Sequence, residues 1–271
     1  MLDLFNIPTP QTANYQEFYG PGAGNTTKDD RTWVKPRGAS MVRFMLIGAG
    51  GDGGIGSSAQ GGGGGASASV TSWIGPAIFV PDILSIRLGV RGGGATAGTS
   101  RITYYSSNGI NILLSATGGG NGSTTTAGGV AGAAMVANQF TASGIFSSTI
   151  GQAGAAGSAT GAGTNQAAST VTFLSGGAGG AGAAANTGGS VTPTYGYTPL
   201  PVTTAGGTVA GANGYFITQP ILVGCGGAGG STSTTVGSAG GKGGIGCGGG
   251  GAGEDGSVGR GGDSAVFIWS W

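Results

Sequence analysis

The sequence predicts a mainly β protein with short, sandwich-like strands, glycine-rich extended segments and little or no α-helix. Glycine accounts for 67 of the 271 residues, whereas an ordinary chain of this length carries about 19. Each glycine inside a helix costs about 1 kcal/mol relative to alanine, so this density opposes long helices. No apolar pattern repeats every 3.6 residues, and the apolar residues instead form short runs bounded by glycine.

Eight short runs rich in β-branched and aromatic residues are predicted to be strands. They are residues 41–47, 66–74, 83–88, 102–105, 110–114, 171–174, 215–223 and 264–269. Short strands separated by turn-forming residues are typical of sandwiches, in which two sheets bury one face each.

The glycine tracts between these runs have a period of three. Glycine recurs at every third position from Gly240 to Gly249, and a second register from Gly241 to Gly253 is interrupted only by Cys247. Three residues per turn is the period of the polyproline II helix. Glycine on two of three faces would let such helices pack backbone to backbone, with neighbouring chains as hydrogen-bond partners. The tracts therefore predict packed polyglycine II helices, and flexible linkers are the alternative.

Residues 1–39 differ in composition from the rest and are interpreted as an N-terminal attachment arm. They contain four prolines and several aromatic residues, and residues 40–271 are predicted to form the glycine-rich β domain. The aromatic side chains proposed to dock are Phe5, Tyr15, Phe18 and Tyr19. The alternative is an ordinary N-terminal cap over the core.

Charge and composition argue against several classes of function. Charged residues make up 7% of the chain and the net charge is +1, so there is no broad basic footprint for nucleic acid. No stretch is apolar enough to insert into a membrane, and the first residues lack the pattern of a secretory signal. The chain has no histidine for acid–base chemistry near neutral pH. We expect a protein that is not an enzyme, with no cofactor and no metal site.

Two motifs need a structural interpretation as well as a functional one. Gly48, Gly50 and Gly53 match the spacing of a dinucleotide-binding loop. Because one residue in four is glycine, such matches arise by chance. The loop also requires a following helix to bind the pyrophosphate, and residues 55–65 cannot form one. Cys225 and Cys247 share the same Gly-Cys-Gly-Gly setting. This suggests equivalent places in neighbouring segments, either as small buried thiols or as a disulfide.

Tyrosines in a proline-rich segment are the best candidates for a contact loop. Tyr195 and Tyr197 lie in residues 191–201, which also contain three prolines. Tyrosine offers a large amphipathic surface at low entropic cost, and proline stiffens the loop that carries it. Tyr104 and Tyr105 are the second choice. The alternative is a loop that only covers the bundle.

The stretch Trp-Val-Lys-Pro-Arg-Gly at residues 33–38, the strand at 41–47 and Gly-Ala-Gly-Gly at 48–51 resemble the glycine-rich domains of bacteriophage tail and tail-fibre proteins. The resemblance covers residues 31–101 and 224–271. A looser likeness is to the polyglycine-helix adhesins at the fibre tips of T-even-like phages. In that family an N-terminal region attaches the protein, and loops between the glycine motifs touch a bacterial receptor.

This resemblance implies a virion structural protein, made in the host cytoplasm, that works as a fibre or spike component with a host-recognition role. Its partners would be other virion proteins and a bacterial surface receptor, and it would act as a homo-oligomer or in many copies. One alternative is a capsid or tail decoration protein with no receptor contact. A remote alternative is an ice-binding protein, although no regular threonine spacing is present.

Overall fold

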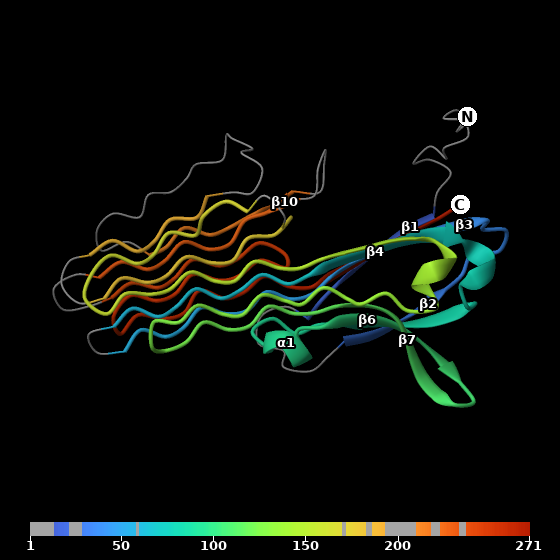
Figure 1. Ribbon diagram of the computed structural model, residues 1–271, viewed down its shortest axis with the longest axis horizontal. Coiled ribbons are helices and arrows are strands. Elements are labelled where there is room, and N and C mark those ends of the chain that lie inside the picture. The colour runs from blue at the N-terminus through green and yellow to red at the C-terminus, as the bar shows by residue number, and fades with distance from the viewer. Residues whose placement is uncertain are drawn as a thin grey trace.

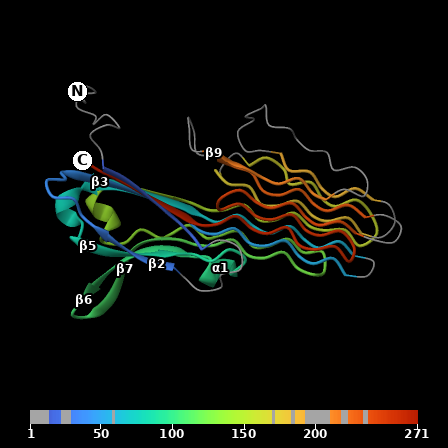
Figure 2. The same cartoon turned by 180° about the vertical axis from the view of Figure 1, so that it is seen from behind.

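The protein is elongated, with a β-sandwich at one end and a bundle of glycine-rich extended chains at the other (Figures 1 and 2). A computed structural model describes residues 14–21, 29–57, 60–169, 172–182, 186–192, 210–217, 223–232 and 237–271. The prediction of a mainly β protein is confirmed.

One face of the sandwich is a five-stranded antiparallel sheet in the order β1-β11-β3-β4-β8. Its strands are β1 (Asn14–Tyr19), β11 (Ala265–Ser270), β3 (Met41–Ile47), β4 (Val70–Pro76) and β8 (Ile145–Thr149). Side chains alternate between the two faces of a strand, so Val42, Phe44 and Leu46 of β3 point into the sandwich.

The other face is a four-stranded antiparallel sheet in the order β2-β5-β6-β7. It comprises β2 (Asp29–Val34), β5 (Ile83–Leu88), β6 (Ser100–Ser106) and β7 (Gly109–Ala116). β6 and β7 form a hairpin that projects from the sandwich (Figure 1). Gly109 follows its two-residue turn with a φ of +109°, a conformation that favours glycine.

The two sheets pack on each other through one apolar core. Leu84, Ile86 and Leu88 of β5 alternate inward to meet the inward side chains of the five-stranded sheet. The ring of Phe44 lies between two tryptophans, with its centroid 5.7 Å from that of Trp33 and 5.9 Å from that of Trp73. Aromatic pairs at this spacing add to the stability that burial of their area provides.

Helical structure in the described residues is limited to α1 (Gly94–Ala97) and two 3-10 turns, η2 (Ala77–Phe79) and η3 (Thr141–Ser143). No helix in this part of the chain is long and apolar enough to cross a membrane. A short pair of strands, β9 (Phe216–Ile217) and β10 (Val223–Gly224), completes the regular structure.

The bundle is built from the glycine tracts, whose backbones bond to several neighbours at once. Residues 61–69 are all buried, and their N–H groups donate in turn to residues 152–158, 246–252 and 117–123, at 2.8–3.1 Å. Every third N–H reaches the same neighbour. One such set is Gly62, Gly65 and Ala68, whose partners are the carbonyls of Ala252, Gly249 and Gly246.

The carbonyls of the same segment accept hydrogen bonds from three further chains, residues 48–54, 129–132 and 177–180. The segment is therefore surrounded by six extended neighbours, as in hexagonally packed polyglycine II helices. Residues 246–253 and 174–182 are surrounded in the same way. The predicted packing of polyglycine II helices is thus present in the structure.

Glycine is required in this lattice because a Cβ atom would occupy the space of a neighbouring backbone. A Cβ on Gly251 would lie 2.0 Å from the carbonyl oxygen of Gly62 and 2.9 Å from the nitrogen of Gly180. Each tract has three faces along its length, and small side chains fit on the face that points into the space between neighbouring chains. Ser67, for example, is fully buried and donates its hydroxyl to the carbonyl of Leu174 at 3.0 Å.

One predicted strand is not formed in its described residues, a second is present only as two short strands, and three strands were not predicted. Within the described residues, 172–174 carry only an isolated bridge, and 215–223 contain only β9 and β10. Residues 66–69 belong to the bundle instead of β4, because their N–H groups donate to three chains in turn. The unpredicted strands β1, β2 and β8 are all at sheet edges, where polar residues are usual and apolar alternation is weak.

The lattice predicts that a single methyl group destabilises the bundle interior. Gly251→Ala should lower the free energy of unfolding by about 1–3 kcal/mol, because the chains must move apart to accept the Cβ. The measurement is a urea unfolding curve. The matched control is Gly161→Ala, whose Cβ would meet only the hydroxyl of Ser158 at 3.5 Å. Equal stability of both variants would contradict close packing at Gly251.

Candidate contact surfaces

Three exposed regions are candidates for a functional contact: the turns at the far end of the bundle and the outer faces of the two sheets. The tracts leave the sandwich, reverse direction at the far end and return (Figure 1). We call the described residues of these reversals the tip turns. They are Ser57, Gln60, 123–127, 158–161, Gly182, Asn186, Thr232, Gly237 and 253–256.

The tip turns carry short polar side chains held by local hydrogen bonds. The hydroxyls of Ser123 and Thr125 lie 2.7 Å apart, and the N–H of Gly161 donates to the hydroxyl of Ser158 at 2.9 Å. Glu254 and Asp255 are the charged residues of these turns. Such a surface offers hydrogen-bond donors and acceptors on a rigid base. It suits recognition of a polar partner better than proton transfer.

The outer face of the five-stranded sheet presents an aromatic row from β1 and β11. The rings of Tyr15 and Trp269 stack with centroids 5.1 Å apart, and the guanidinium of Arg43 lies 5.0 Å from the Trp269 ring centroid. Tyr19 packs edge-on to Phe267 at 6.1 Å. Burial and a hydrogen bond with Glu17 raise the pKa of Tyr19 to about 12. The raised pKa values keep the phenols of Tyr15 and Tyr19 neutral, and their rings pack against those of Trp269 and Phe267.

The aromatic residues proposed for the attachment arm do not all lie on one exposed surface. Tyr15 and Tyr19 lie on the outer face of the five-stranded sheet and are about half exposed, whereas Phe18 packs against the sandwich core. Phe5 lies outside the described residues. Residues 14–19 and 29–34 form strands of the two sheets, and the boundary after residue 39 stays a prediction.

The outer face of the four-stranded sheet contains an open pocket of about 260 Å³. We call it the β5–β7 pocket. It is lined by Arg87, Arg101, Thr103, Tyr105, Ile110 and Ile112.

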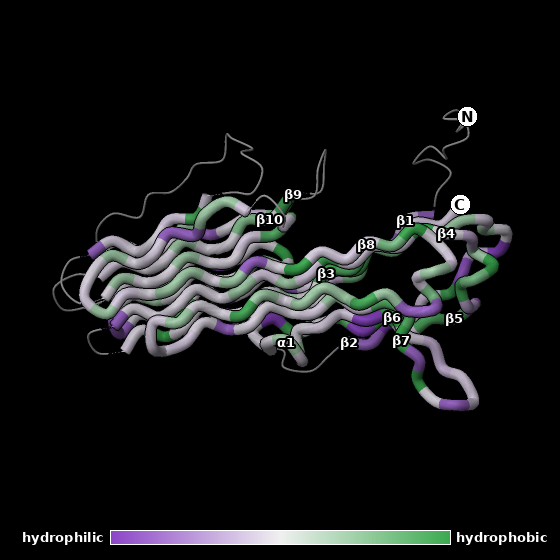
Figure 3. Tube along the Cα trace, viewed as in Figure 1, coloured by the Kyte–Doolittle hydropathy of each residue, from purple (hydrophilic) through white to green (hydrophobic). Residues whose placement is uncertain are grey.

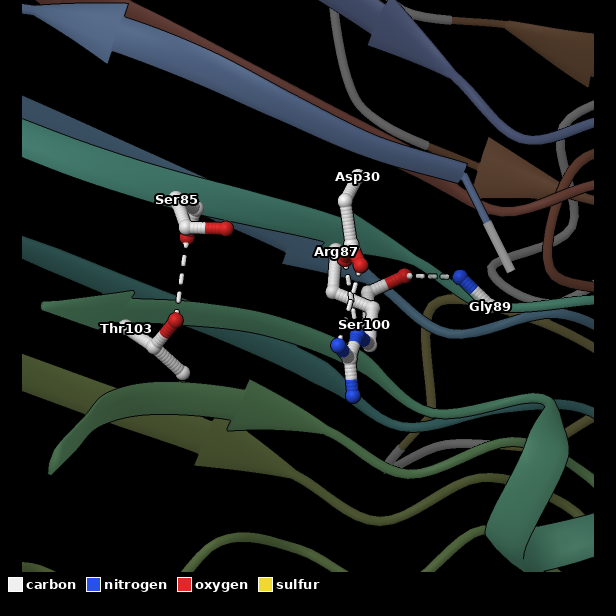
Figure 4. Close-up of polar contacts among 6 residues, drawn as sticks. All are labelled: Asp30, Ser85, Arg87, Gly89, Ser100 and Thr103. Atoms are coloured by element: carbon white, nitrogen blue, oxygen red, sulfur yellow. Dashed lines mark hydrogen bonds and ion pairs between the residues drawn. The ribbon is translucent and has the colours of Figure 1, made fainter. Parts of the chain in front are cut away.

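Arg87 is locked into the pocket wall by a two-point contact with Asp30 (Figure 4). Its Nε donates to one carboxylate oxygen at 2.7 Å and its second nitrogen donates to the other at 2.9 Å. This contact raises the pKa of Arg87 further above its ordinary value. Thr103 donates its hydroxyl to the carbonyl of Ser85 at 3.4 Å. The pocket floor is therefore held by neighbouring strands.

The structure places the tyrosines predicted for a contact loop in different environments. Tyr105 is 68% exposed and lines the β5–β7 pocket, whereas the adjacent Tyr104 packs against the core, as expected for successive residues of a strand. Tyr195 and Tyr197 lie outside the described residues, and their role stays a prediction. The sequence reasoning missed Arg101 and Ile112, which come together only because β6 and β7 pair.

Cys225 and Cys247 are free, buried thiols, so the first of the two alternatives for them is the one observed. Cys247 packs with Ile47, Leu174 and Phe267 where the bundle meets the five-stranded sheet. Burial raises the pKa of Cys225 to about 11 and that of Cys247 well above its ordinary value. Within the described residues, no group of three or more histidine, cysteine, aspartate or glutamate side chains could hold a metal ion.

No protein-family model matches the chain, and no curated protein sequence matches it.

The buried thiols predict a loss of stability at alkaline pH. An unfolded thiol ionises near pH 9, whereas folding holds Cys225 protonated to about pH 11. The stability that the protonated Cys225 thiol contributes is fully present below pH 9 and is lost as the pH rises through 11. This loss lowers the free energy of unfolding by about 2 kcal/mol. Urea unfolding curves at pH 8, 9, 10 and 11 measure this.

The control for this prediction is the double variant Cys225→Ala and Cys247→Ala. Its stability should depend less steeply on pH between 9 and 11, with the tyrosines still contributing at the upper end. Identical slopes for the variant and the parent protein would contradict the assignment to the thiols.

Proposed function

We propose that this protein is a non-enzymatic virion structural protein, a fibre or spike component of a phage that presents its tip turns to the host surface. The observation that carries the proposal is the division of the molecule into two ends. The sandwich holds β1 and the C-terminal strand β11, and the tip turns lie at the opposite end of the bundle (Figure 1). Such a molecule can be attached at one end and make contacts with the other.

The distribution of polarity supports this division. The tube in Figure 3 is pale along the bundle and strongly coloured at the sandwich, which carries both apolar and charged residues. The ion pairs of the described residues, such as Lys35–Asp82 and Arg87–Asp30, lie in the sandwich or at its junction with the bundle. The bundle is held by neutral backbone hydrogen bonds, which salt screens far less than surface ion pairs.

The tip turns also suit a contact surface that must vary. Exposed positions in these turns such as Thr124 and Thr160 already carry a Cβ outside the packed interior, so their side chains can change without placing a new Cβ in the lattice. The hydrogen-bonded lattice fixes the positions of the tracts that each tip turn connects. Rigid scaffolds that carry variable loops are a common arrangement for recognition.

Two measurements test the proposal. Gold-labelled antibody against the protein should mark fibre tips or vertex spikes of particles from the source culture. Label spread over the shell or along the tail tube would support the alternative, a decoration protein without receptor contact. Particles without any label would contradict the virion assignment.

Adsorption of the purified protein to host cells tests the tip turns directly. Thr124→Arg and Thr160→Arg each place a large charged group on an exposed tip turn and should weaken adsorption about tenfold or more, the loss expected for a disrupted contact. Ser107→Arg is the matched control, because Ser107 is exposed in the β6–β7 hairpin at the other end. Unfolding curves should be unchanged in all three variants. Equal adsorption of the tip and control variants would contradict the tip as the contact surface.

A further inference from the structure

We infer that the outer face of the four-stranded sheet is a docking site for a peptide segment that carries a carboxylate beside a branched aliphatic or aromatic side chain. The site is the β5–β7 pocket together with the apolar side chains that border it. This inference goes beyond the proposed function and does not depend on a role in a virus particle.

The apolar part of the site consists of exposed side chains on the outer face of all four strands. Val34 of β2 pairs with Ile83 of β5, and Tyr105 of β6 pairs with Ile110 of β7. These four side chains are 59–68% exposed, and Ile112 next to them is 44% exposed. Large apolar side chains that gather on one exposed sheet face are typical of a surface that another molecule covers.

The charge of the site points to an anionic partner. Arg87 is neutralised by its two-point contact with Asp30. Arg101 opposes Ser115 on β7 and, among the described residues, makes no hydrogen bond or ion pair. The pocket therefore offers one uncompensated cation between apolar walls. A guanidinium in this position binds a carboxylate with a charge-assisted hydrogen bond.

The same charge argues against a second copy of this chain as the occupant. A symmetric contact through this face would bring two Arg101 side chains together, and the carboxylate of Asp30 beside them is already paired with Arg87. The walls also argue against a sugar, because Ile110 and Ile112 offer no hydrogen bonds to hydroxyl groups. The volume of about 260 Å³ is below the usual range for small-molecule sites, about 300–1,000 Å³, and suits one or two side chains of a peptide.

The test is a selection of random dodecapeptides from a display library on the immobilised full-length protein. Peptides that also bind the Arg101→Gln, Ile112→Thr double variant are removed. The retained peptides should share an aspartate or glutamate next to valine, isoleucine, leucine or phenylalanine. Fluorescence anisotropy then measures each dissociation constant. Arg101→Gln should raise it about tenfold, the effect of one charge-assisted hydrogen bond.

The control variant is Arg43→Gln, which makes the same change on the outer face of the other sheet and should leave the dissociation constant unchanged. A second measurement needs no protein variant: replacing the peptide's aspartate by asparagine should also weaken binding about tenfold. The proposal is overturned if no peptide is retained, if the retained peptides lack a carboxylate, or if the aspartate and asparagine peptides bind equally.

Discussion

The close approach of neighbouring backbones in the bundle is the constraint on which the rest of the structure depends. Successive N–H groups of a tract such as residues 61–69 donate to three neighbouring chains in turn, and its carbonyls accept hydrogen bonds from three others. This arrangement exists only without side chains between the chains, because a Cβ on most tract glycines would overlap a neighbouring carbonyl. The glycine content of the chain follows directly from this geometry.

Such a bundle needs the sandwich to hold its chains in place. Ordering a glycine backbone costs about 1–2 kcal/mol per residue, whereas each hydrogen bond contributes about 0.5–1.5 kcal/mol net. The lattice is therefore marginal by itself. Tracts continue from β3 and β7 and return into β4 and β11. The apolar core around Phe44 and Trp73 thus sets the register of the tracts that leave it.

The two ends of the molecule consequently offer different chemistry. The sandwich keeps its large side chains, so its outer faces carry an aromatic row and a cationic pocket with apolar walls. The bundle excludes large side chains from its interior and presents polar groups at its tip turns. Under the proposed function, such a protein would recognise its partners by shape, stacking and hydrogen bonds. The proposed attachment and contact roles correspond to these two ends.

The sequence by itself determined the absence of long helices, the strands with strong apolar alternation and the period of three in the tracts, because these are local properties of the chain. The edge strands β1, β2 and β8 were decided by tertiary structure, since a polar segment becomes a strand there only when a central strand offers its edge. The same holds for the β5–β7 pocket. Arg101 and Ile112 become neighbours through the register of β6 and β7, which shifts at a bulge between Ile102 and Thr103 that no local pattern specifies.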